Sequence, residues 1–333
     1  MSFELILPFF PEEVRSLLVD RTISDLMING TTGVYADRNG VIERVPLSVP
    51  FTNERLQAAV ERVARILGQD LTTQNPILNT RLPDGSRVAV VGPPASVNGV
   101  TLTIRKFNRW YSTDELIGMG TLPRSVRDQV VQFMKEKRNG IISGGTGSGK
   151  TTLMKAFLDH LPIEDRLLII EQPTELRVRQ PHAIRWEAVD AIPGQVAITP
   201  SDLLAAALRH RPDRIIIGEV RNECAYDLLQ AMNTGHGGTL STVHAKSGLD
   251  ALNRLANLAL SARPNLNHAF VRSETAAAID FVLYCEREQT GARHIRELIA
   301  VTGYSQAEQC FQAETLYSGS VSREPARSGA AAA

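Results

Sequence analysis

Residues 144–151 read GGTGSGKT, placing four glycines, a lysine and a threonine in the spacing G-x-x-x-x-G-K-[ST]. The run follows apolar residues 140–143 and precedes helix-like residues 153–158. Glycines let successive backbone N–H groups turn inward around phosphate oxygens, because no Cβ stands in the way. Lys150 can then reach the β and γ phosphates and Thr151 can coordinate Mg²⁺, while the helix N-terminus adds partial positive charge. The sequence therefore predicts a nucleoside triphosphate site.

The predicted nucleotide-binding residues form one continuous segment. They are Gly144, Gly145, Thr146, Gly147, Ser148, Gly149, Lys150, Thr151 and Thr152. The alternative is a glycine-rich turn that only joins a strand to a helix. Such a turn would need neither the lysine nor the threonine, so we favour phosphate binding.

Two apolar strands farther along the chain each end in a carboxylate. Glu171 follows residues 167–170, and Glu219 follows residues 215–218. Ligands collect at the carboxyl ends of strands in open α/β sheets. One carboxylate there can hold hydrated Mg²⁺ while the other orients and polarises an attacking water, which is what phosphate hydrolysis requires. The alternative is a structural ion pair, for example between Glu219 and an arginine nearby.

A third segment, residues 234–245, carries His236 and His244 around a glycine-rich turn. The alternative for both is a loop histidine that satisfies backbone groups. The remaining histidines lie outside any ligand-like spacing, so no metal is predicted besides the Mg²⁺ that accompanies the nucleotide. A group of arginines interspersed with acids between residues 202 and 223 predicts an ion-pair network near the active site rather than a nucleic-acid surface.

Composition narrows the functional class. The 333 residues suggest two domains, and Lys plus Arg and Asp plus Glu number 36 each. This balance argues against a nucleic-acid coat or a polybasic membrane anchor. Three widely spaced cysteines indicate reduced thiols in a cytoplasmic protein. The N-terminus lacks the basic leader of a secretory signal, and the longest uncharged stretch, residues 88–104, contains prolines and glycines that rule out a membrane-spanning helix.

The helix and strand patterns in residues 1–105 predict an α+β domain. The expected helices cover residues 12–19 and 52–67, and the expected strands cover residues 25–29, 34–37, 41–45, 87–91 and 100–104. Asn29-Gly30 and Asn39-Gly40 are hairpin signals between strands. Residues 106–120 are the expected connector, with a capping-box pattern at Ser112 and Glu115.

Residues 121–317 alternate between strand and helix patterns. Strands are expected at residues 141–143, 166–170, 214–218 and 239–243, and helices at residues 123–139, 153–158, 201–210 and 223–232. This alternation predicts an α/β fold with a largely parallel sheet covered on both faces. The apolar stripes of residues 225–232 and 252–259 are typical of helix faces in a core, with oligomer contact as the alternative. Residues 318–333 are expected to be a disordered tail.

Six segments resemble, in order, those of the type II/IV secretion-system ATPase superfamily: RLPDGSRV, TLTIRKF, GGTGSGKT, IIEQPTEL, LRHRPDRIIIGEVR and TGHGGTLSTVHA. The resemblance is strongest to the branch of conjugal transfer, type IV secretion and Tad pilus assembly. It implies a RecA-like P-loop ATPase domain with a smaller α+β N-terminal domain, using ATP and Mg²⁺ in a homo-hexameric ring. It also implies a cytoplasmic protein, peripheral at the inner-membrane face, whose partners are inner-membrane components of such a machine.

The resemblance assigns roles to individual residues. Lys150 and Thr151 contact phosphate and Mg²⁺, and Glu219 orients the attacking water. Glu171 matches the first acid of an acidic box that usually continues with Asp, where this chain has Gln172. The missing carboxylate leaves the contribution of this box open.

The remaining roles concern communication with the nucleotide. His236 and His244 match a histidine box that senses the γ phosphate and links it to the neighbouring subunit. Arg87 and Arg105 match arginines that the N-terminal domain presents to the nucleotide on closure, and a guanidinium offers a planar fork to phosphate oxygens. The alternative for both arginines is a surface position on a strand.

These patterns favour an ATP-hydrolysing motor subunit. One alternative is a nucleic-acid-translocating ATPase of related fold, which would need a basic channel rich in aromatic residues, whereas aromatic residues make up 5% of this chain. No direct sequence-specific nucleic-acid binding is expected. The other alternative is a nucleotide-binding adaptor with weak hydrolysis, which Gln172 keeps open. Turnover measured with and without DNA distinguishes the three.

Overall fold

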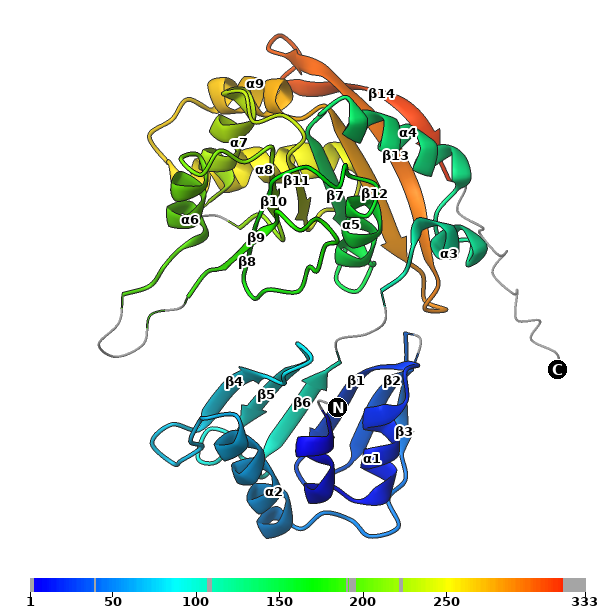
Figure 1. Ribbon diagram of the computed structural model, residues 1–333, viewed down its shortest axis with the longest axis vertical. Coiled ribbons are helices and arrows are strands. Elements are labelled where there is room, and N and C mark those ends of the chain that lie inside the picture. Colours follow the sequence, from blue (N-terminus) through cyan, green and yellow to red (C-terminus); the bar gives the residue numbers. More distant parts are fainter. Residues whose placement is uncertain are drawn as a thin grey trace, which may run out of the picture. The chain divides into compact units, whose positions relative to one another are not determined.

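A computed structural model describes residues 3–38, 40–106, 110–189, 191, 196–221 and 224–319 (Figure 1). Contacts divide the chain into two compact units. The first comprises Met1–Trp110 and Gln289–Ala292, and the second comprises Tyr111–Glu288 and Arg293–Ala333. Each unit contains its own sheet.

The first unit is built on a six-stranded sheet of order β3-β2-β1-β6-β5-β4, in which all neighbouring strands are antiparallel. Its described elements are two 3₁₀ turns at Phe3–Leu5 and Leu7–Phe9, α1 Glu12–Val19, β1 Ile23–Asn29, β2 Val34–Arg38, β3 Val41–Val45, α2 Asn53–Ile66, β4 Ile77–Arg81, β5 Arg87–Val91 and β6 Thr101–Arg105. Buried apolar residues from both helices and the sheet form one core. The predicted strands and helices of this region are found, and β4 is an additional strand that was not predicted.

Local sequence explains the element boundaries of the first unit. The Thr52 hydroxyl accepts a hydrogen bond from the backbone N–H of Arg55 at 3.3 Å and so caps α2. Gly68 follows the helix with a φ of 72°, a conformation that favours glycine. At the β1–β2 hairpin, a Cβ on Gly30 would lie 2.3 Å from the carbonyl oxygen of Asn98, so glycine is required there. Asn39 of the second hairpin signal lies outside the described residues.

The predicted connector contains a short helix, α3 Thr113–Gly118. The Ser112 hydroxyl accepts from the backbone N–H of Glu115, and the Glu115 carboxylate accepts from the backbone N–H of Ser112 at 2.8 Å. The predicted capping box is therefore confirmed. Residues 107–109 lie outside the described part of the chain.

The second unit carries an eight-stranded sheet of order β14-β13-β12-β7-β11-β10-β8-β9. After α3, its described elements are α4 Arg124–Lys135, β7 Gly140–Gly144, α5 Lys150–Leu158, β8 Leu167–Glu171, β9 Ile184–Glu187, α6 Pro200–Ala207, β10 Arg214–Ile217, α7 Ala225–Asn233, β11 Leu240–Val243, α8 Gly248–Ala262, α9 His268–Ala278, β12 Phe281–Arg287, β13 Arg293–Ser305 and β14 Cys310–Ser318. In the order β12-β7-β11-β10-β8-β9, all neighbouring strands pair in parallel. At one side of the sheet, β13 pairs antiparallel with both β12 and β14. None of the described helices combines the length and apolar character needed to cross a bilayer.

Both faces of the second sheet are buried. Successive residues of the central strands enter two different cores, for example Ile141 and Ile217 in one and Ile142 and Ile216 in the other. Helices α4 and α5 contribute to the core of one face, and α6 to α9 contribute to the other. The predicted α/β fold class, with a largely parallel sheet covered on both faces, is therefore confirmed.

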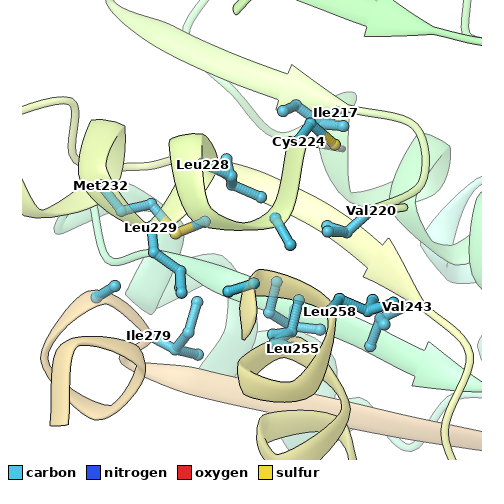
Figure 2. Packing of buried hydrophobic residues seen from close by; sticks show 14 of the residues in the cluster. Ile217, Val220, Cys224, Leu228, Leu229, Met232, Val243, Leu255, Leu258 and Ile279 are labelled. Atoms are coloured by element: carbon cyan, nitrogen blue, oxygen red, sulfur yellow. The ribbon is translucent and has the colours of Figure 1, made fainter. Parts of the chain in front are cut away.

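The apolar stripes of α7 and α8 lie in one of these cores. Figure 2 shows Leu228, Leu229 and Met232 of α7 in the same cluster as Leu255 and Leu258 of α8. All five side chains are buried. Their interpretation as helix faces in a core, rather than as oligomer contacts, is confirmed.

Several predicted boundaries in the second unit were wrong. Pro123 is the N-cap of α4 rather than its first residue, with an extended ψ of 140°. The same helix ends at Lys135, and Lys137 adopts a positive φ of 57° that stops it before residue 139. Strands β9 and β12 to β14 were not predicted. Ser318 belongs to β14 rather than to the tail, and Glu223 and residues 320–333 lie outside the described residues.

Candidate nucleotide site

The carboxyl edge of the second sheet collects most of the predicted site residues. Residues 144–151, here called the phosphate loop, follow β7. Glu171 ends β8, Glu219 follows β10, and His244 follows β11 directly. Because these strands are parallel, their carboxyl ends meet at one edge, where open α/β sheets bind ligands.

Three glycines of the phosphate loop have a positive φ, and the first of them, Gly144, has a φ of 157°. Gly147 has a φ of 72°, and Gly149, the N-cap of α5, has a φ of 94°. Side chains with a Cβ rarely adopt this conformation. Gly145, Thr146 and Gly147 are exposed, so the loop faces solvent at its tip.

Lys150 begins α5 and bends back over the loop. Its ammonium donates to the carbonyl oxygens of Gly144 at 3.1 Å and Gly145 at 2.8 Å. Burial of the side chain lowers the pKa of Lys150, because the charged form loses hydration. Thr151 and Thr152 follow in the first turn of the helix, partly buried. A buried ammonium held by two carbonyls is ready to exchange them for anionic oxygens.

Two arginines that were not predicted from the sequence lie against the phosphate loop. Arg293, the first residue of β13, donates from Nε to the carbonyl oxygen of Gly147 at 2.9 Å. A Cβ on Gly147 would lie 3.0 Å from Nη1 of Arg287, the last residue of β12. Sequence spacing offered no signal for either residue, since they reach the loop from about 140 positions away through strands that were not predicted.

His244 connects the phosphate loop to Glu219. Its Nδ1 lies 3.4 Å from Nζ of Lys150, and its Nε2 lies 3.5 Å from Oε1 of Glu219. Burial and the charge of Lys150 lower the pKa of His244. Because an ammonium can only donate, Nδ1 acts as the acceptor and Nε2 carries the proton that faces Glu219. The structure therefore brings Lys150, His244 and Glu219 together in a row.

The alternative of an arginine ion pair for Glu219 is wrong within the described residues. Arg214 instead pairs with Asp165 at 2.5 Å, next to the amino end of β10. Arg221 donates to the amide oxygen of Gln172 at 3.4 Å. The predicted network of arginines and acids near the active site is corrected accordingly: Arg214 lies at the opposite edge of the sheet, and Arg221 contacts a neutral amide.

Glu171 is engaged by the loop that follows β8. Its carboxylate accepts hydrogen bonds from the backbone N–H groups of Glu175 at 3.0 Å and Leu176 at 3.1 Å. A Cβ on Gly218 would lie 2.9 Å from Cγ of Glu171, so the side chain packs across that glycine. Burial raises the pKa of Glu171 to about 7. The carboxyl group thus anchors the start of residues 172–176.

The raised pKa predicts a pH-dependent stability. Between its ordinary value of 4.5 and about 7, the folded protein keeps a proton on Glu171 that the unfolded chain has released. The free energy of unfolding therefore falls as pH rises through this window. Across this pH window, we expect the free energy of unfolding of wild-type protein to fall by about 3 kcal/mol relative to that of Glu171→Gln. Urea unfolding of both proteins from about pH 4 to about pH 8.5 measures the difference, and a difference that stays constant with pH would contradict it.

His236 lies apart from His244. It precedes β11, whereas His244 follows that strand, so the two histidines stand at opposite edges of the sheet. Four strand residues at about 3.3 Å each separate them by at least about 13 Å. The His236 Nδ1 is buried and has no hydrogen-bond partner in the described structure. The two predicted histidines are therefore not brought together within one chain.

Arg87 and Arg105 are directly opposite each other on β5 and β6 of the first unit. Arg81 on β4 is directly opposite Arg87, so three arginines form a row across neighbouring strands. Like charges in such positions repel. Arg105 also forms an ion pair with Asp25 at 2.8 Å. Arg81 was not predicted as a site residue, because its place in the row depends on pairing with the unpredicted β4.

The chain matches known proteins over most of its length. A family model described as type II/IV secretion system protein matches residues 12–315. The conjugal transfer protein TrbB of Rhizobium radiobacter is 32% identical over 292 residues, which cover 86% of each protein. The type IV secretion system protein PtlH of Bordetella pertussis is 34% identical over 315 residues, covering 86% of this chain and 92% of that protein.

A solved structure agrees with this match at the level of the fold. The ATPase DotB of Legionella pneumophila has a TM-score of 0.62 and 18% identity, over 88% of this chain and 83% of that one. Fold, site geometry and sequence matches thus converge, and the chain belongs to the type II/IV secretion system protein family.

Proposed function

We propose that this protein is an ATP-hydrolysing motor subunit of a bacterial secretion, conjugation or pilus-assembly machine. The observation that carries the proposal is the row of Lys150, His244 and Glu219 at the carboxyl edge of a largely parallel sheet. Family membership supports the same activity. In this proposal residues 121–317 form a RecA-like ATPase domain, which the connector at 106–120 joins to the α+β domain at 1–105.

The chain's own groups fit ATP and Mg²⁺. The glycines of the phosphate loop leave room for phosphate, and Lys150 exchanges its two carbonyl contacts for β and γ oxygens. Thr151 would hold the Mg²⁺, which neutralises developing charge on the phosphates. Glu219 then accepts a proton from the attacking water, and His244 holds Glu219 in place while contacting the γ phosphate.

Glu171 acts indirectly in this proposal. Its hydrogen bonds to residues 175 and 176 position the strand-end segment that carries Gln172, next to Glu219 and Arg221. The glutamine supplies an amide where the family's acidic box usually has a second carboxylate. His236, at the other edge of the sheet, is assigned to contact with a neighbouring subunit.

We further propose that six chains form a ring at the cytoplasmic face of the inner membrane and bind membrane components of the machine. The γ phosphate draws the N-terminal domain closed through Arg87 and Arg105, and hydrolysis releases it, so that chemical energy becomes a domain movement. The register that places Arg87 directly opposite Arg105 supports this role, because it brings the two arginines onto neighbouring strands of one sheet.

Mg²⁺ with a non-hydrolysable ATP analogue should favour a ring of about six chains, because a ligand that binds the closed assembly better than the free chain shifts the equilibrium by mass action. Light scattering over a range of protein concentrations measures the mass. A monomer at every nucleotide and protein concentration would contradict the ring motor.

A mixing experiment tests how the arginines act. Arg105→Ala should leave ATP binding largely intact while hydrolysis falls, because charge developing on the transferred phosphoryl group loses a cation. If Arg105 serves the nucleotide of its own chain, as we propose, rings mixed from Arg105→Ala and Lys150→Ala chains contain no intact site and stay inactive. Substantial activity on mixing would show that Arg105 reaches a neighbouring chain.

A further inference from the structure

A cavity of about 320 Å³ lies beside Glu219. Its polar rim consists of Glu219, Arg221, His244 and Arg254, and its floor is apolar. Val243 and Leu258, which belong to the floor, sit in the packed core of the unit (Figure 2). The volume falls at the lower end of the range for small-ligand sites, roughly 300 to 1,000 Å³. We call this space the arginine cavity.

Within the described residues, two cations of the arginine cavity have no carboxylate partner. Arg254 is exposed on α8 and forms no hydrogen bond or ion pair within the described structure. Among the described residues, Arg221 donates to the neutral amide of Gln172, at 3.4 Å. An aspartate at position 172 would have compensated that charge. The glutamine therefore leaves both guanidiniums available to an anion.

The arginine cavity adjoins Glu219, the last residue in the row of Lys150, His244 and Glu219. His244 faces Lys150 with one ring nitrogen and Glu219 with the other, and Glu219 lines the cavity. Burial and then nearby cations, with Lys150 ahead of Arg254 and Arg221, lower the pKa of His244. Glu219 is the only carboxylate on the described rim. In the proposed hydrolysis it takes a proton from water, so the rim is most positive when phosphate forms.

We propose that the arginine cavity binds inorganic phosphate, with Arg221 and Arg254 holding the ion after it leaves the γ position. The proposal rests on the proposed ATP hydrolysis for the source of the ion. Two guanidinium forks match the oxygens of a tetrahedral phosphate, because each fork can donate two hydrogen bonds to an anion. Arg254 thereby controls how long the product stays in the site.

The test is equilibrium dialysis of radiolabelled inorganic phosphate against protein saturated with Mg²⁺ and ADP, which fills the phosphate loop. Arg254→Ala should weaken phosphate binding by about tenfold or more, the scale of a lost charge-assisted hydrogen bond. Arg254→Lys keeps the charge but loses the guanidinium fork, so its phosphate affinity should fall between those of wild type and Arg254→Ala. Arg263→Ala is the matched control, since Arg263 caps the end of the same helix and pairs with Asp227 away from the cavity.

Folding is not at risk in the key variant, because Arg254 is exposed and alanine suits a helix. Wild-type phosphate binding that Arg254→Ala leaves unchanged would overturn the proposal, as would wild-type protein that binds no phosphate. If Arg254→Ala binds phosphate like wild type but no longer assembles into a ring, the cavity would instead bind an acidic side chain of a second copy of the chain. The dialysis needs no turnover, so an inactive protein that still binds phosphate through Arg254 would refute the ATPase and not the phosphate site.

Discussion

Glu219→Gln is expected to lower ATP turnover by about 10² or more while ATP still binds, the usual scale for losing general-base assistance. Glutamine keeps the shape of the side chain but cannot accept a proton from water. Glu219 is suited to this role because it is partly exposed, with 38% of its side chain accessible, and lies 3.5 Å from His244. Steady-state phosphate release and binding of a fluorescent ATP analogue measure the two effects separately.

Glu171→Gln is the matched control for this prediction. The Glu171 carboxyl is buried and bonded to backbone amides, so its loss should change stability more than the chemical step. We expect Glu171→Gln to retain more turnover than Glu219→Gln. An inactive Glu171 variant beside a normal Glu219 variant would mean that the two carboxylates have exchanged roles.

Lys150→Ala is expected to weaken binding of the ATP analogue at least tenfold. The ammonium is buried at the phosphate loop, where charge-assisted hydrogen bonds contribute about 1.5 to 3 kcal/mol. Lys135→Ala, which removes an exposed lysine from the last turn of α4, should bind like wild type. Equal affinity of the Lys150 variant and wild type would show that the phosphate loop does not bind phosphate.

Local patterns explain what could be predicted from the sequence. The phosphate loop, the strand leading to Glu219 and the capping box at Ser112 each depend on residues within a few positions of one another, and all three are found. The alternation of strand and helix patterns predicted a largely parallel sheet buried on both faces, because the helices that connect parallel strands pack against those faces. The fold class followed from these signals.

Long-range contacts explain what was missed. Arg293 reaches the phosphate loop only because β12 pairs with β7, and no local spacing shows this. Arg254 lines the arginine cavity because α8 packs beside the ends of β10 and β11. His236 and His244 are eight positions apart in the sequence, yet a four-residue strand between them carries them to opposite edges. Their shared motif therefore did not predict a shared location.

ATP turnover by purified wild-type protein without DNA tests the proposed motor function most directly. The Lys150→Ala variant gives the background rate. We expect wild-type protein to release phosphate from ATP well above that background, and added DNA to leave the rate unchanged. Turnover that appears only with DNA would indicate a nucleic-acid-translocating ATPase. Wild-type turnover no higher than that of Lys150→Ala, with or without DNA, would contradict the motor and leave a nucleotide-binding adaptor.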